Sequence, residues 1–75
     1  MDELLEILRD IQPDVDYEHC ETLIDDGYID SFALISLITS INRVFDAEIT
    51  AEHIVPENFN SARAIMDLIQ RLAAE

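Results

Sequence analysis

Apolar residues recur at helical spacing in three separate stretches of this chain. One stretch runs from Asp2 to Gln12, a second from Ser31 to Phe45, and a third starts at Asn60 or Ser61. Apolar side chains at i, i+3, i+4 and i+7 form one face of a helix, which is typical of amphipathic helices packed on a core. The predicted core positions are Leu4, Leu5, Leu8 and Ile11, then Leu34, Leu37, Ile38, Ile41 and Phe45, and then Ile65, Leu68, Ile69 and Leu72.

The connections between these stretches carry turn signals and apolar anchors. Pro13 ends the first helix, because the residue before a proline is pushed out of the α region. The segment 14–30 contains enough apolar residues to pack onto the domain, and Gly27, the only glycine, predicts a turn with positive φ. Pro56 predicts one short helical turn. Strand-like alternation is absent, so the predicted fold is an all-α bundle of three main helices plus one short helix.

The charge of the chain is strongly acidic. Its 75 residues, which form a single domain spanning 1–75, contain 17 Asp and Glu, no lysine and four arginines, for a net charge of −13. Eleven of the carboxylates lie within residues 1–30. A chain of this charge is not expected to bind nucleic acid by neutralising phosphates, and it favours basic protein partners met by electrostatic steering. Small size and mutual repulsion predict a monomer.

Cysteine usage and hydropathy bear on the compartment. The single cysteine, Cys20, excludes an intramolecular disulfide and is predicted to be a buried thiol in a reducing compartment. The acidic N-terminus lacks the basic region of a signal peptide, and no apolar run approaches the roughly 20 residues of a membrane span. These features predict a cytoplasmic protein without a membrane span.

Ser31 is the most informative residue for function, because it stands where an acidic loop becomes the second predicted helix. Serine is favoured at helix N-caps, but Asp30 is itself a good cap. Catalysis by Ser31 would need a base and an oxyanion hole, yet the chain has only His19 and His53 and lacks a Gly-x-Ser-x-Gly elbow. No dedicated metal-ligand spacing is present either. The pattern favours a presented hydroxyl over a catalytic one, and the chain is predicted not to be an enzyme.

Two apolar residues beside Ser31 do not belong to the predicted core face. Phe32 and Ile35 lie off the stripe set by the second helix's core positions. Exposed apolar side chains next to an exposed serine predict a contact patch for a partner.

Several segments of the chain resemble the acyl carrier protein family. They are Asp30-Ser31-Phe32, the helix end Phe45-Asp46-Ala47-Glu48-Ile49, and Asn58-Phe59-x-Ser61-x-x-x-Ile65-x-x-Leu68-Ile69. The similarity covers nearly the whole chain, and the Asp30-Ser31 pair with Phe45 and Ile49 at family spacing is its most specific part.

The resemblance implies a freestanding carrier whose Ser31, preceded by Asp30, receives 4′-phosphopantetheine from coenzyme A. The terminal thiol of that group would hold an acyl or aminoacyl cargo as a thioester. The implied partners are a phosphopantetheinyl transferase, a loading ligase and downstream transferases. Phe32, Ile35 and Ile49 are the predicted partner-contacting residues.

The second helix departs from carriers of fatty acid synthesis, which usually present several acids there. It has no carboxylate between Ser31 and Phe45. We therefore rank an aminoacyl or specialised acyl cargo, as in D-alanyl or freestanding peptidyl carriers, above a general fatty acyl chain. The alternative function is a non-enzymatic acidic adaptor that binds a basic protein and leaves Ser31 unmodified.

Overall fold

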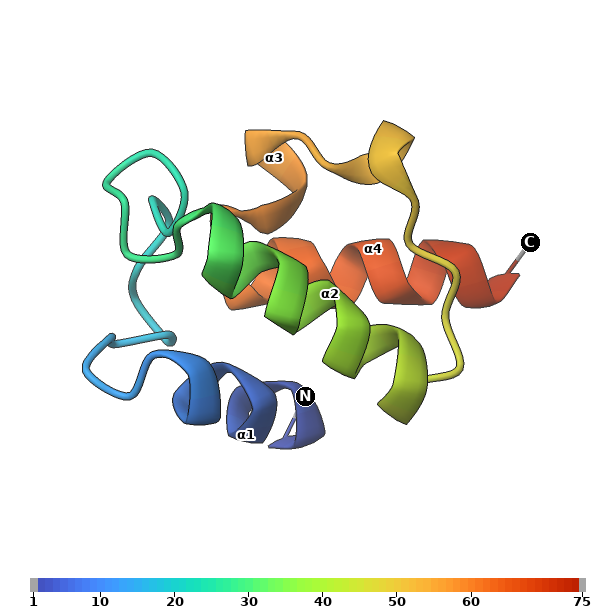
Figure 1. Ribbon diagram of the computed structural model, residues 1–75, viewed down its shortest axis with the longest axis horizontal. Coiled ribbons are helices and arrows are strands. Elements are labelled where there is room, and N and C mark those ends of the chain that lie inside the picture. The colour runs from blue at the N-terminus through green and yellow to red at the C-terminus, as the bar shows by residue number, and fades with distance from the viewer. Residues whose placement is uncertain (1, 75) are drawn as a thin grey trace.

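The computed structural model describes residues 2–74, and its elements are all helical (Figure 1). The helices are α1 (Asp2–Ile11), α2 (Ser31–Val44), α3 (Pro56–Phe59) and α4 (Ala62–Ala74), and a single 3-10 turn (Ala51–His53) precedes α3. No strand occurs within this range. The predicted all-α class, with three main helices and one short helix, is confirmed.

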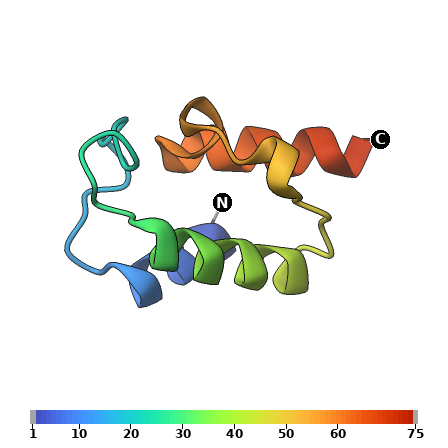
Figure 2. The ribbon, with the colours of Figure 1, turned by 45° about the horizontal axis from the view of Figure 1, so that its top comes forward.

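The helices form two layers. α1 packs on α2, and α3 packs on α4, while α1 also contacts α4. Figure 2 shows α1 and α2 side by side below α3 and α4. The chain folds back between α1 and α2, so these two helices run in opposite directions (Figure 1). Two layers of amphipathic helices enclose a single core between their apolar faces.

The core is built largely from the predicted stripe positions. Leu4, Leu8, Leu37, Ile41 and Ile65 are fully buried. Each such side chain contributes about 1.5–3 kcal/mol relative to leaving it in water. Six other predicted positions are partly buried and pack against this core: Leu5, Ile11, Leu34, Ile38, Phe45 and Leu72. The helical spacing therefore identified the correct face of every main helix.

The long connection between α1 and α2 also contributes to the core, as predicted. Tyr17, Leu23 and Ile29 are buried, and the Tyr17 hydroxyl donates a hydrogen bond of 3.0 Å to the Leu8 carbonyl. Gly27 has a φ of 76°, which confirms the predicted left-handed turn. Cys20 differs from its prediction in degree, because it is partly buried rather than buried and packs against the edge of the core.

The connection after α2 contains the one element that was not predicted. Thr50 precedes the 3-10 turn, and its backbone N–H donates to His53 Nδ1 at 3.1 Å, while the His53 N–H donates to the Thr50 carbonyl at 3.0 Å. In a capping box, the side chain that accepts from the N-cap N–H is usually a Glu or Gln, and here it is His53. The sequence therefore lacked the capping signature that would have predicted the turn.

Candidate functional site

The site is centred on the first turn of α2. Asp30 is the N-cap: it has extended backbone angles, and its Oδ1 accepts a hydrogen bond of 2.9 Å from the Ala33 N–H. Ser31 is consequently the first helical residue and is exposed. Because Asp30 caps the helix, the Ser31 hydroxyl is not needed for capping.

The loop before Ser31 is held by hydrogen bonds to its backbone groups. Ile29 is buried, and its N–H donates to the Leu23 carbonyl at 3.0 Å, while the Leu23 N–H donates to the Asn60 carbonyl at 2.9 Å. Gln12 Nε2 also donates to the Tyr28 carbonyl at 3.1 Å. Ser31 therefore stands on an anchored segment although its own side chain faces solvent.

Asn60 holds the loop before Ser31, a contact that the sequence did not predict. Asn60 and Ser61 were the two expected starts of the last helix, and Ser61 is the one that caps it, since Ser61 Oγ accepts from the Ala64 N–H at 3.0 Å. Asn60 Oδ1 instead accepts from the N–H groups of Ile24 and Asp25, at 3.0 and 3.1 Å. No local pattern distinguishes these two adjacent capping residues, so the long-range contact could not be read from the sequence.

Phe32 and Ile35 lie at the surface, as expected. Their side chains are 85% and 62% exposed, and residues three apart on a helix share a face. We call these two residues the α2 patch. An aromatic ring so fully exposed on a small domain is a feature of contact surfaces.

Ile49 requires a correction. It was predicted to contact partners, but only 6% of it is exposed, and it belongs to the core. Its backbone N–H donates to Asn42 Oδ1 at 3.0 Å, which holds the segment against α2. The side chain thus faces inward and is not part of the α2 patch.

The charge around Ser31 is asymmetric. Asp25, Asp26 and Asp30 are exposed in the loop that precedes it. The only charged residue within α2 itself is Arg43, near the opposite end. Negative charge therefore lies on the loop side of Ser31, and an apolar surface lies on the helix side.

Neither histidine is joined to Ser31 by a hydrogen bond. His19 Nδ1 lies 2.8 Å from Asp16 Oδ2, and His53 Nδ1 accepts from the Thr50 N–H in the segment that follows α2. Within residues 2–74, no side chain forms a hydrogen bond with the Ser31 hydroxyl. Among the described residues, the Ser31 hydroxyl is therefore not hydrogen-bonded to a side chain that could act as its general base.

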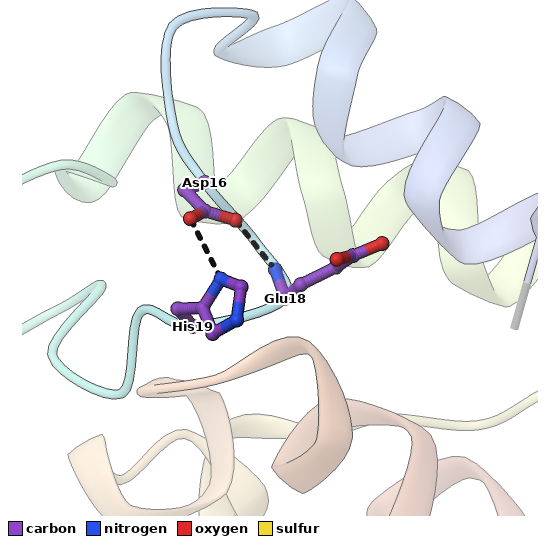
Figure 3. Close-up of side chains that lie close together, drawn as sticks. All are labelled: Asp16, Glu18 and His19. Carbon is purple, nitrogen blue, oxygen red and sulfur yellow. Dashed lines mark hydrogen bonds and ion pairs between the residues drawn. The ribbon is translucent and has the colours of Figure 1, made fainter.

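A second polar cluster lies in the turn after α1 and was not anticipated from sequence. Candidate ligand atoms of Asp16, Glu18 and His19 lie within 4.8 Å of one another, and all three residues are exposed. Asp16 Oδ1 also accepts from the Glu18 N–H at 3.2 Å (Figure 3). The hydrogen bond with Asp16 raises the pKa of His19, and the same bond lowers the pKa of Asp16. The two carboxylate oxygens of Asp16 are therefore paired with the Glu18 N–H and with His19 inside an exposed turn.

Comparison with known proteins adds no family assignment. No protein-family model matches the chain, and no curated protein matches it at a significant level. Among residues 2–74, no helix is both long enough and apolar enough to cross a membrane.

Proposed function

We propose that the chain is a freestanding acyl or aminoacyl carrier protein that holds its cargo on 4′-phosphopantetheine attached to Ser31. The observation that carries this proposal is that Asp30, and not Ser31, caps α2. Asp30 caps the helix, so Ser31 is free and exposed at the helix terminus. The α2 patch beside it offers a surface on which a modifying enzyme can dock.

The first turn of α2 fits a phosphodiester at Ser31. The Ala33 N–H is taken by Asp30 Oδ1, and the Leu34 N–H donates to the Asp30 carbonyl at 2.8 Å. The N–H groups of Ser31 and Phe32 precede these bonds and belong to the orphan donors of the helix terminus, which favour an anion. The negative charge of Asp30 and Asp26 opposes the anion. The fit therefore rests on the exposed Ser31 hydroxyl and on the N–H groups of Ser31 and Phe32.

The chemistry of attachment requires only the hydroxyl from this chain. Ser31 Oγ attacks the phosphorus of coenzyme A that bears the pantetheine. An Oγ–P bond forms, and the bond from that phosphorus to 3′,5′-ADP breaks with its electron pair leaving on the ADP oxygen. The Ser31 proton passes to a base of the transferase. When attached, the group supplies a terminal thiol that holds cargo as a thioester.

The charge pattern favours an aminoacyl or specialised acyl cargo. Loading ligases and downstream transferases would dock on the α2 patch, which carries no charge at Phe32 or Ile35. Tethering raises the effective concentration of cargo at each docked active site, and the acidic loop speeds reversible encounters with basic enzymes. We place this carrier in the cytoplasm, where coenzyme A is available and Cys20 stays reduced.

The test is the intact mass of the protein after incubation with coenzyme A, Mg²⁺ and a promiscuous phosphopantetheinyl transferase. A gain of one phosphopantetheine that is lost in Ser31→Ala is the expected result. Ser36→Ala is the matched control, because Ser36 is an exposed serine of the same helix and should leave the gain unchanged. If the folded protein gains no mass while a known carrier is modified in parallel, the acidic adaptor becomes the better proposal.

A further inference from the structure

A groove lies at the end of α2 that is farthest from Ser31. It is bounded by the segment 45–53 and by the last two turns of α4, and it has a volume of about 530 Å³. Figures 1 and 2 both show the C-terminal ends of α2 and α4 on the same side of the molecule, with the connecting segment between them. This volume is within the usual range of small-molecule sites, about 300–1,000 Å³.

Part of the lining of the groove is apolar. Phe45 and Leu72 line it and are partly buried, and Ile69, which also lines it, is 6% exposed. These side chains belong to the edge of the core, so their positions are fixed by packing. A ligand with an aliphatic or aromatic body can cover them and remove apolar surface from water.

Acidic residues also line the groove. Asp46, Glu48 and Glu52 line it and are exposed, and no arginine lines it. Its one other ionisable side chain is His53, whose Nδ1 is already an acceptor for the Thr50 N–H at 3.1 Å. A ligand in the groove therefore meets three carboxylates.

The acidic segment is tied to α2 at Ile49. Asp46 has a φ of 54°, the left-handed conformation in which the chain leaves α2. Three residues later, the Ile49 N–H donates to Asn42 Oδ1 at 3.0 Å. This hydrogen bond fixes the backbone next to Glu48, which therefore has little backbone freedom to lose when a ligand binds.

We propose that this groove binds a small organic ammonium compound with an apolar body. A metal ion suits it less well, because the only described residues whose ligand atoms gather closely enough to share one ion are Asp16, Glu18 and His19, which lie elsewhere. Carboxylates that are spread around an apolar wall suit a larger cation, whose ammonium faces the acids while its body covers Phe45 and Leu72.

The groove is independent of the proposed attachment site. α2 has 14 residues, and a helix rises about 1.5 Å per residue, so the two ends lie about 20 Å apart. Ser31→Ala should bind the same ligand with unchanged affinity. Failure of this inference therefore leaves the carrier proposal untouched, and the reverse also holds.

The experiment is a titration of the ¹⁵N-labelled protein with 2-phenylethylamine, followed by amide chemical shifts. The neutral isostere 2-phenylethanol is titrated in parallel. The expected result is saturable shifts confined to residues 45–53 and 69–73, with the amine binding at least about fivefold more tightly than the alcohol. A few exposed ion pairs, each of modest strength, are enough to account for a difference in affinity of about fivefold.

Two variants test the acidic residues and the space of the groove separately. Replacing Asp46, Glu48 and Glu52 by Asn, Gln and Gln should weaken amine binding about fivefold or more, and Asn suits the left-handed position of Asp46. Ala73→Leu should weaken both compounds, because Ala73 lines the groove and a larger side chain fills it.

The matched control removes equal charge elsewhere. Replacing the exposed residues Asp14, Glu18 and Glu21 by their amides should leave amine binding within about twofold, because they lie outside the groove. Three results would overturn the inference. They are equal binding of the amine and the alcohol, equal loss in the control and groove variants, and shifts spread over the acidic residues 1–30.

Discussion

The side chain of Asn60 makes two hydrogen bonds with Asp25, a residue 35 positions earlier in the chain. Asn60 Oδ1 accepts from the Asp25 N–H at 3.1 Å, and Asn60 Nδ2 donates to Asp25 Oδ2 at 3.2 Å. The same Oδ1 accepts from the Ile24 N–H at 3.0 Å. The junction between α3 and α4 thereby fixes the loop that leads to Ser31.

We expect Asn60→Ala to lower the free energy of unfolding by about 1–2 kcal/mol, because the Ile24 and Asp25 N–H groups lose their acceptor. Urea denaturation followed by circular dichroism measures the change. Gln70→Ala, at an exposed position of α4, is the control and should stay within about 0.5 kcal/mol of the wild type. Equal stability of the two variants would mean that the Asn60 contacts contribute nothing.

The helices and most of their buried faces were predictable because they rest on local periodicity. Leu37 and Ile41 are four apart on one helix, so a pattern of period 3.6 identifies them as core residues before any tertiary contact is known. The exposure of Phe32 and Ile35 followed from the same pattern, because they fall off the stripe.

The wrong predictions concern residues outside the regular helices, where hydrophobic periodicity gives no information. Ile49 stands in a segment without regular structure, so its inward orientation depends on the contact with Asn42 seven residues earlier. The choice between Asn60 and Ser61 as the cap of α4 depends on a loop contact across 35 residues. Such contacts are properties of the assembled fold and leave no local signature in the sequence.

A second prediction concerns the cap of α2. Asp30→Ala should cost about 1 kcal/mol of stability, because the Ala33 N–H loses its 2.9 Å acceptor. Asp30→Asn retains an acceptor and should stay close to the wild type. Ser31→Ala should also be near neutral, since Ser31 lies one residue inside the helix. A larger loss in Ser31→Ala than in Asp30→Ala would show that the serine is the true cap.

A third prediction follows from the unbalanced charge. Within residues 2–74, the only ion-pair contacts are two that involve histidines, so none of the arginines offsets a carboxylate directly. Added salt screens the repulsion of the net charge of −13. Raising NaCl from about 10 to 150 mM should increase the melting temperature by about 5 °C or more. A flat response would show that the repulsion is relieved in another way.

A fourth prediction concerns the exposed pair Asp16 and His19. The hydrogen bond raises the pKa of His19 above its usual value of 6.5, so its stabilising effect is present below pH 6.5 and is lost as pH rises through the raised pKa. The lowered pKa of Asp16 acts oppositely: its contribution is present above pH 3.8 and is lost as pH falls. Between pH 3.8 and pH 6.5, both His19 and Asp16 therefore contribute their full stabilising effect.

Asp16→Asn should move the pKa of His19 back toward 6.5, as measured from the imidazole resonances in an NMR titration. Asparagine can still accept from the Glu18 N–H, which now donates to Asp16 Oδ1, so the turn itself should persist. Glu21→Gln, an exposed acid outside the pair, is the control. An unchanged His19 pKa in Asp16→Asn would show that the two side chains do not pair in solution.

The fifth prediction rests on the proposed function and concerns the α2 patch. Phe32→Asp and Ile35→Asp should each change the free energy of unfolding by less than about 1 kcal/mol, because both side chains are mostly exposed. Each should lower kcat/KM for phosphopantetheinylation about tenfold or more, because a charge would have to be desolvated against an apolar partner surface. Arg43→Gln makes the same change in net charge at the far end of α2 and should have a smaller effect. If the Asp variants unfold the domain, Phe32 and Ile35 belong to the core. If they are folded and modified at the wild-type rate, the transferase does not dock on the patch.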